Sequence, residues 1–314
     1  MARHSPMLYY DVAADTLARY RRFMWDFAYR ATGTIADADT VLRECYPRAV
    51  HPPVADQQSD AQRFLTSGAA RIALEILRQR KRRHYVGCWL PAPLETGNAA
   101  SPGSRPDATV SPRYDVVESG STAFLLALEA LEARERILLT LCDTLGFAVR
   151  DAAAALELTS ATGKTALQSA RRKMQQYDAA HVPPTTDVQA SVAAVLREFL
   201  SHLQEYNLPA LEKTLASDAR ALFDSAGEFV APAGSVFGCE TVARLLARFT
   251  ERSGPVNFSF RMVNGLPAAL GHAKARARWA SRFVLAIEES DGLVARVHAV
   301  LATSKLTAIR FDPL

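Results

Sequence analysis

The stretch VRDAAAALELTSATGKTALQSARRKMQQY (Val149–Tyr177) decides the fold of the middle of this 314-residue chain. Its first ten residues are expected to form a short helix, and a tight turn at Leu158–Ser160 joins that helix to a longer one. The preceding segment AFLLALEALEARERILLTLCDTLG is predicted to be a single helix that starts at Ala123 and ends at Gly146. Three short helices in this order are typical of a helix-turn-helix.

The last of these helices would enter the major groove of DNA, with side chains on roughly one face. The expected DNA-contacting residues are Lys164, Thr165, Gln168, Arg171 and Arg172. The alternative is an ordinary solvated basic face on one of three amphipathic helices. The tetrapeptide TGKT in this helix resembles the end of a phosphate-binding loop, but Leu158 stands where that loop needs glycine, so no nucleotide site is expected.

A second basic cluster, LRQRKRR (Leu77–Arg83), ends a helix expected from about Ser59 to Arg83. Six Arg or Lys residues and one acid, Glu75, lie between Arg71 and His84. Such a helix end can follow DNA phosphates, although it too can be a solvated face. The expected phosphate contacts are Arg71, Arg78, Arg80, Lys81, Arg82 and Arg83.

Length and composition indicate a multidomain cytoplasmic protein. A chain of 314 residues with 49% hydrophobic content suits two or three compact domains. No window approaches 18 apolar residues, and the amino terminus lacks the order of a signal peptide. The four cysteines stand far apart, so neither a metal site nor a disulfide framework is expected.

Proline, glycine and serine divide the chain into segments. Gly97–Arg113 is predicted to be a flexible linker, and the prolines of HVPPTTD mark a second boundary. In the first segment a break is expected at Thr32–Thr34, followed by a helix that starts near Asp37 and ends at Pro47. The predicted organisation is domain 1–96, linker 97–113, domain 114–180, linker 181–187 and domain 188–314.

The third segment is predicted to be an α+β domain. Helices at 188–203 and 208–215 precede strand-like runs at 256–263, 275–289, 293–303 and 305–311. Helices followed by a bent antiparallel sheet would form a cone with a cavity, and its candidate lining residues are Asp224, Trp279, Phe283 and His298. Asp224 is expected to serve a turn or an interdomain contact, with a general base in an apolar cavity as the alternative. His272 and His298 are expected to be ordinary strand or loop residues.

These segments resemble a known family of transcription factors. FMWDFAYRATGTIADADTVLREC and RFLTSGAARIALEILRQRKRR are similar to domain 2 of an extracytoplasmic-function (ECF) sigma factor, and LEALEARERILLTLCDTLGFAVRDAAAALELTSATGKTALQSARRKM resembles its domain 4. YVGCWLPAPL resembles the signature of a subgroup that carries a SnoaL-like domain after domain 4. The run FLSHLQEYNLPALEKTLASDARALFDSAGEFVAPAGSVFGCETVARLLARF resembles the start of that SnoaL-like domain, and Val263–Gly265 with Pro267 resembles its second half.

The resemblance implies all-α sigma domains 2 and 4 followed by an α+β SnoaL-like cone. It implies a non-catalytic subunit without metal or cofactor, whose partners are the RNA polymerase core (its beta-prime and beta subunits) and promoter DNA. Region 1–96 would bind polymerase and the −10 element, and 114–180 the −35 element, while the linker threads the polymerase. Phe64 would support the region where a base leaves the duplex. Residues implied to meet polymerase are Asp37, Asp39 and Glu44.

Several residues depart from the family pattern. Thr40 and Arg43 replace acidic or glutamine positions of the polymerase-binding helix, and Gly163 replaces an aliphatic residue of the reading helix. Glycine lowers helix stability by about 1 kcal/mol relative to alanine. Ala166 and Ser169 replace frequent basic positions, which weakens phosphate binding without changing which bases are read.

The tail domain is expected to regulate the sigma domains within the same chain. Trp89, held by nearby prolines, would anchor the tail against them, and the alternative is that it packs on domain 2. The residues assigned to this interdomain role are Trp89, Pro91, Pro93, Asp224 and Gly227. Two further functions stay open: a degenerate sigma-like protein whose cavity binds or converts a small molecule, and a sigma factor gated by such a ligand.

Overall fold

The computed structural model describes residues 21–50, 58–82, 85–96 and 112–313. It divides into two compact units, which we call the helical unit (Met1–Arg83 with Ser101–His181) and the tail unit (His84–Ala100 with Val182–Leu314). Residues 85–96, which follow α3, therefore belong to the tail unit. The predicted domain boundary at residue 96 groups them with the preceding helices instead. No helix in the described part of the chain is long and apolar enough to cross a membrane. Arg83 and nearly all of Gly97–Arg113 lie outside the described residues.

The domain-2 part of the helical unit consists of the helix of residues 21–32, α2 (Ile35–Val50) and α3 (Gln58–Arg82). Gly33, at a φ of 77°, provides the expected break between the first two. The helix of residues 21–32 buries Phe23, Met24 and Phe27. The expected end at Pro47 is wrong, because α2 continues to Val50; proline removes one N–H donor without ending this helix. The side chain of Phe64 lies outside the described part.

The domain-4 part contains more helices than predicted. Its elements are η1 (Glu118–Gly120), α4 (Thr122–Ala127), η2 (Leu128–Ala130), α5 (Ala133–Leu139), the π-helical turn η3 (Thr140–Thr144), α6 (Val149–Ala155), α7 (Ser160–Lys173) and α8 (Gln175–Ala180). The single helix expected from Ala123 to Gly146 is therefore wrong. Glu132 has an extended backbone and forms a capping box with Glu135, which starts a new helix at Ala133.

Helices α6 and α7 approach each other at Gly163. A Cβ atom there would lie 2.6 Å from the Cβ of Ala153, so a larger residue does not fit without movement of one helix. Thr159 caps α7 by accepting a hydrogen bond from the backbone N–H of Thr162. The glycine that departs from the family pattern is thus matched to a small residue on the facing helix.

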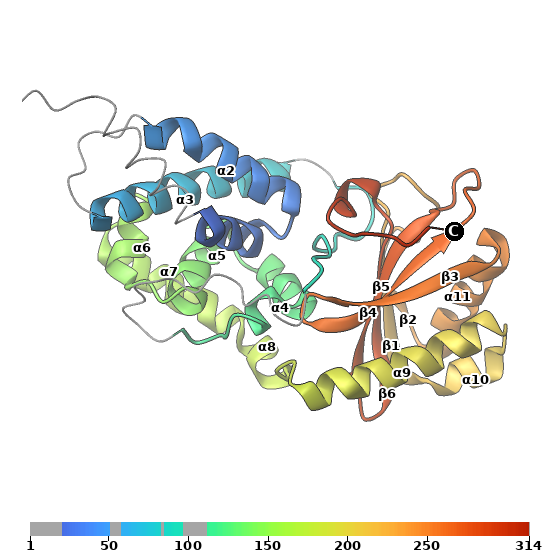
Figure 1. Cartoon of the computed structure of the whole chain (residues 1–314). Coiled ribbons are helices and arrows are strands. Elements are labelled where there is room, and N and C mark those ends of the chain that lie inside the picture. The colour runs from blue at the N-terminus through green and yellow to red at the C-terminus, as the bar shows by residue number, and fades with distance from the viewer. Residues whose placement is uncertain (1–20, 51–57, 83–84, 97–111, 314) are drawn as a thin grey trace, which may run out of the picture. The chain divides into compact units, whose positions relative to one another are not determined.

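The tail unit packs helices against one mixed sheet (Figure 1). Strand β1 pairs with β6 in parallel, and the other neighbours pair antiparallel in the order β2-β1-β6-β5-β4-β3. The helices are α9 (Thr186–Gln204), α10 (Leu208–Lys213) and α11 (Cys239–Ser253). The strands are β1 (Leu215–Asp224), β2 (Val236–Phe237), β3 (Val256–Val263), β4 (Leu266–Ala273), β5 (Arg282–Ser290) and β6 (Leu293–Val300), with η4 (Thr303–Lys305) after them.

The α+β prediction is confirmed, with differences in the details. Strand β3 has the predicted bounds, whereas residues 305–311 form no strand and instead leave the sheet after η4. Sequence patterning missed β1 and β4, since β1 ends in a buried carboxylate and β4 (LPAALGHA) is built from proline and small residues. Gly271 of β4 leaves room for the ring of Phe283, which occupies the position that a Cβ would take.

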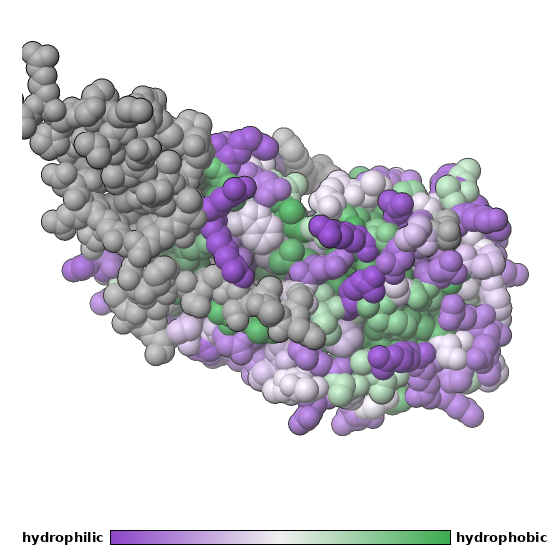
Figure 2. Space-filling model, viewed as in Figure 1, coloured by the Kyte–Doolittle hydropathy of each residue, from purple (hydrophilic) through white to green (hydrophobic). Residues whose placement is uncertain are grey.

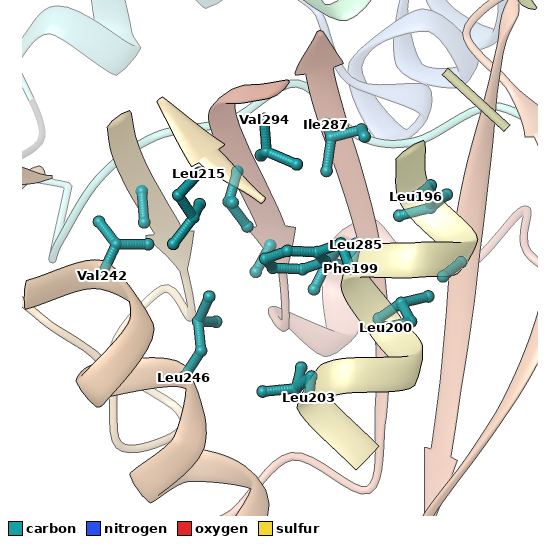
Figure 3. Close-up of a cluster of buried hydrophobic side chains, with 14 of the residues drawn as sticks. Leu196, Phe199, Leu200, Leu203, Leu215, Val242, Leu246, Leu285, Ile287 and Val294 are labelled. Atoms are coloured by element: carbon teal, nitrogen blue, oxygen red, sulfur yellow. The ribbon is translucent and has the colours of Figure 1, made fainter. Parts of the chain in front are cut away.

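The core of the tail unit lies between the helices and one face of the sheet. Figure 3 shows Phe199 of α9 beside Leu285 of β5 within this core, to which Leu246 of α11 also belongs. Phe223 contacts Phe249 edge to face at 5.3 Å, and Phe249 contacts Trp279 at 5.5 Å. On the visible surface hydrophobic residues gather near α9 and the β3–β4 hairpin (Figure 2).

Candidate functional site

The basic end of α3 is largely occupied by acids of the domain-4 part. Arg80 donates to the Glu129 carboxylate at 2.8 and 3.1 Å, and Lys81 donates to that of Glu132 at 2.9 and 3.0 Å. Arg71 lies 3.3 Å from Glu157. Arg78 and Arg82 are exposed. Three of the predicted phosphate-binding residues of this helix, Arg71, Arg80 and Lys81, therefore form ion pairs with acids of the same unit.

Helix α7, the predicted reading helix, presents Lys164, Thr165, Gln168 and Arg172 to solvent. Arg171 differs from them, because its Nε and Nη2 donate to Asp143 at 2.9 and 2.6 Å. These hydrogen bonds raise the pKa of Arg171. The Asp143 side chain is 2% exposed, so the pair ties the end of α7 to the π-helical turn.

The predicted polymerase-binding acids lie on two sides of α2. Asp37 and Glu44 are seven residues apart, close to two helical turns, and share a face, whereas Asp39 points to the opposite side. Asp39 accepts a hydrogen bond from Trp25 Nε1 at 2.8 Å, and the hydroxyl of Thr34 caps the backbone N–H of Asp37. The acids do not form one surface.

A buried carboxylate in the tail unit holds the segment that leaves α3. We call residues 85–96 the strap and the ion pair of Asp224 with Lys305 the latch, in which Lys305 Nζ lies 2.6 Å from Asp224 Oδ2. The same carboxylate accepts from the Tyr85 hydroxyl at 2.5 Å and from the Leu90 backbone N–H at 2.7 Å. The fully buried Asp224 is thereby bonded to both ends of YVGCWL.

Aromatic rings of the strap enclose the latch cation. Lys305 Nζ lies 4.8 Å from the ring centre of Tyr85 and 4.5 Å from that of Trp89. It also donates to the Leu90 carbonyl at 2.5 Å. Gly227 has a φ of 79°, and a Cβ there would lie 3.2 Å from Val86. The turn after Asp224 is therefore shaped to the strap.

The far end of the strap extends the sheet at its β3 edge. Thr96 N–H donates to the Met262 carbonyl at 2.8 Å, and Asn264 N–H donates to that of Leu94 at 2.9 Å. Glu95 pairs with Val263 in an antiparallel bridge. Between the two anchors Pro91 and Pro93 are buried. The structure thus brings together all the residues assigned an interdomain role, within the tail unit.

Comparison with known proteins shows which family the chain resembles. Residues 121–174 match the family Sigma-70, region 4. The chain is 27% identical over 301 residues to the ECF RNA polymerase sigma factor SigJ of Mycobacterium tuberculosis, covering 91% of each chain. It is 24% identical over 312 residues to a probable ECF RNA polymerase sigma factor, SigI, of the same organism, covering 98% of this chain and 99% of that one. Along nearly its whole length this chain is similar to extracytoplasmic-function sigma factors.

A solved structure supports the same fold. The crystal structure of M. tuberculosis SigJ matches with a TM-score of 0.70 at 22% identity, covering 95% of this chain and 99% of that one. The predicted order of all-α sigma domains and an α+β tail is confirmed. The matching relatives are RNA polymerase sigma factors, which is the family that the resemblance indicated.

The interior of this sigma factor's tail gives no support to the catalytic alternative. Phe223 and Val297 face the hydrophobic core, so their neighbours Asp224 and His298 lie on the opposite face of the sheet. Of the four side chains expected to line a cavity, Trp279 and Phe283 are the aromatic ones, and both pack in aromatic contacts on the helix-facing side. Asp224 is therefore not placed to act as a base on the core-facing side of the sheet.

Sequence reasoning missed some of the residues that hold the strap. Lys305 lies in ATSKLT, where no pattern marks it, and it is 7% exposed. Asn264 was noted only for its family resemblance; its side chain accepts from the Leu94 N–H at 3.1 Å. Tyr85 is the first residue of YVGCWLPAPL, but only Trp89, Pro91 and Pro93 of that stretch were predicted to have an interdomain role. A buried carboxylate needs a partner of opposite charge, so Asp224 was the residue from which a nearby cation could have been predicted.

Proposed function

We propose that this sigma factor carries its own regulator, and that the tail controls promoter use through its hold on the strap. The latch supports this proposal: Asp224 binds both Tyr85 and Leu90 in the chain that joins domain 2 to domain 4. The family resemblance implies that the linker 97–113, which directly follows the strap, threads the polymerase. A strap bonded to the tail restrains the start of that linker, so release or retention of the strap would set the activity.

The same proposal assigns contacts in transcription. The chain would bind the RNA polymerase core through α2, with Asp37 and Glu44 on one face and Asp39 on the other. Domain 4 would read the −35 element through the exposed residues of α7, which are Lys164, Thr165, Gln168 and Arg172. Arg78 and Arg82 would meet phosphates near the −10 element. No cofactor takes part.

The test is in vitro transcription with bacterial core polymerase on a library of promoter fragments. It compares the full chain, a version ending near Asp187, and the full chain with Asp224→Asn. Glu251→Gln, on the exposed side of α11, is the matched control. If the tail acts through the strap, Asp224→Asn shifts the transcript yield in the same direction as truncation, and Glu251→Gln leaves it unchanged.

Two outcomes would contradict this proposal. Equal transcription from the full chain and the truncated version would remove the regulatory role of the tail. Absence of transcripts and of core binding from every version would remove sigma activity itself. Trp89→Ala provides a further check, because loss of its stacking on Lys305 should change transcription while the domain-2 helices stay folded.

A further inference from the structure

The acids at the start of α5 lie where DNA phosphates are expected. Glu129 lies in η2 and Glu132 caps α5, three residues later. Their carboxylates accept hydrogen bonds from consecutive cations of α3, Arg80 and Lys81. A carboxylate and a phosphate oxygen make the same charge-assisted hydrogen bonds with these side chains. The α3 cations therefore have an internal anionic partner in the same unit.

Glu129 also neutralises a buried arginine. Arg136 of α5 is 2% exposed and donates to Glu129 through Nη1. Its Nε and Nη2 have no hydrogen-bond partner among the described residues. Burial lowers the pKa of Arg136, the Glu129 carboxylate opposes that change, and charges of Arg80 and Asp37 also act on it. The contact between α3 and α5 is thus centred on one shared carboxylate.

This contact is built to be reversible. Lys81 and Glu132 are 74% and 63% exposed, and pairs in that environment contribute little stability. Unpaired buried N–H groups cost free energy that is regained when water reaches them. Opening of the contact would therefore rehydrate Arg136 and release two cations. An exposed ion pair and a buried arginine with unpaired N–H groups are both features of a contact that can open.

We propose that domain 4 masks the DNA-binding end of domain 2 in the free sigma factor. Glu129 and Glu132 occupy Arg80 and Lys81 as internal substitutes for phosphate, and the duplex must displace them to bind α3. This masking rests on the proposed function for the identity of the ligand. It is independent of the strap and latch, which lie in the tail unit.

Binding of a labelled 20-base-pair duplex of mixed sequence, followed by fluorescence anisotropy between 50 and 200 mM NaCl, tests the masking. The full chain with Glu129→Gln and Glu132→Gln is compared with Glu198→Gln and Glu251→Gln, which remove the same charge from exposed sites of α9 and α11. The masking predicts tighter binding by roughly two- to thirtyfold at low salt, which is what two such ion pairs hold back. The slope of log K against log salt should steepen by about 2 for two released cations.

Glu132→Gln alone keeps Glu129 beside Arg136, so it guards against loss of folding, and it should steepen the slope by about 1. Hydrogen exchange of the amides at the start of α5 should accelerate in the double variant and in the unaltered chain on addition of DNA. Equal affinity and slope in the variant and its control, including no binding by either, would overturn the masking. Sigma activity is scored separately by transcription, so the two failures are distinguishable.

Discussion

Asp224 shows how one buried carboxylate can position a distant segment. It is fully buried and bonded to Lys305, to the Tyr85 hydroxyl and to backbone N–H groups of Leu90 and Ala226. The sequence predicted a role in a turn or an interdomain contact, and the structure places Asp224 before a turn and in contact with the strap, which belongs to the same unit. The identity of the cation could not be predicted, because Lys305 is brought to Asp224 only by the course of the chain after β6.

The first prediction concerns the latch. Asp224→Asn leaves the Lys305 charge buried without its counterion, so the free energy of unfolding of the tail unit should fall by about 3–5 kcal/mol. Urea unfolding of the full chain, followed by tryptophan fluorescence, measures it. Asp224→Asn with Lys305→Met should recover much of the loss, and equal destabilisation by the single and double changes would contradict the role of the pair.

The second prediction concerns His298. Burial lowers its pKa below the ordinary 6.5, Glu288 opposes this shift and Arg296 adds to it. His298 therefore binds a proton near pH 6.5 in the unfolded chain but only at lower pH in the folded chain. The free energy of unfolding consequently falls as the pH drops below 6.5. The urea midpoint should decrease between pH 7 and pH 5, and decrease less in His298→Asn. His202→Gln, at a less buried histidine, serves as control and should keep the decrease.

At the scale of elements, the close approach of α6 and α7 explains an unusual glycine. Sequence patterning found both helices and their turn, because periodicity and capping residues are local. It counted Gly163 only as a loss of helix stability, since the facing Ala153 is not visible in a single helix. The extra break at Glu132 was missed for a related reason: the apolar period continues across it, and only the capping box reveals it.

The third prediction separates two helical glycines. Gly163→Ala should destabilise the helical unit by about 1–3 kcal/mol, because the added methyl overlaps Ala153, although alanine favours helices. Gly68→Ala in α3 meets Cys45 Sγ at an ordinary 3.7 Å and should stabilise by up to about 1 kcal/mol. Thermal unfolding distinguishes them. Ala153→Gly should rescue Gly163→Ala, and a stabilising Gly163→Ala would refute the packing explanation.

The fourth prediction separates neighbouring arginines of α7. Arg172→Ala should weaken duplex binding and reduce the salt slope by about 1, with stability unchanged. Arg171→Ala should lower stability by about 1–3 kcal/mol, because it leaves the buried Asp143 carboxylate without its partner. Anisotropy and urea unfolding measure the two effects. If both variants lost only DNA affinity, Arg171 would be a phosphate contact as the sequence suggested.

For the whole molecule, the order and the fold class of the domains were predictable from the sequence. The unit to which the strap belongs was not. A proline-rich segment after a basic helix can pack on either neighbour, and its hydrogen bonds to Asp224 and Asn264 come from residues more than a hundred positions away. Local pattern carries no information on such pairings. The family resemblance supplied the interdomain role, and the structure supplied the partner.

The fifth prediction follows from that membership. A version ending near Asp187 lacks every tail group that binds the strap, so buried residues such as Leu90 and Ala92 become exposed. Limited proteolysis should cleave residues 85–96 much faster in the truncated version than in the full chain. Cleavage in the helical unit provides the internal reference. Equal protection of the strap in both versions would show that it is held elsewhere.

The strap also has a consequence for synthesis on the ribosome. Leu90 is 215 residues ahead of Lys305, and all of domain 4 is translated between them. At roughly 5–20 residues per second, the nascent chain spends on the order of 10–40 s with the strap made and its partner not yet available. Both sigma domains can fold within that interval. In every newly made molecule the strap is therefore without its tail partners during this interval, and it can bind them only after Lys305 has been synthesised.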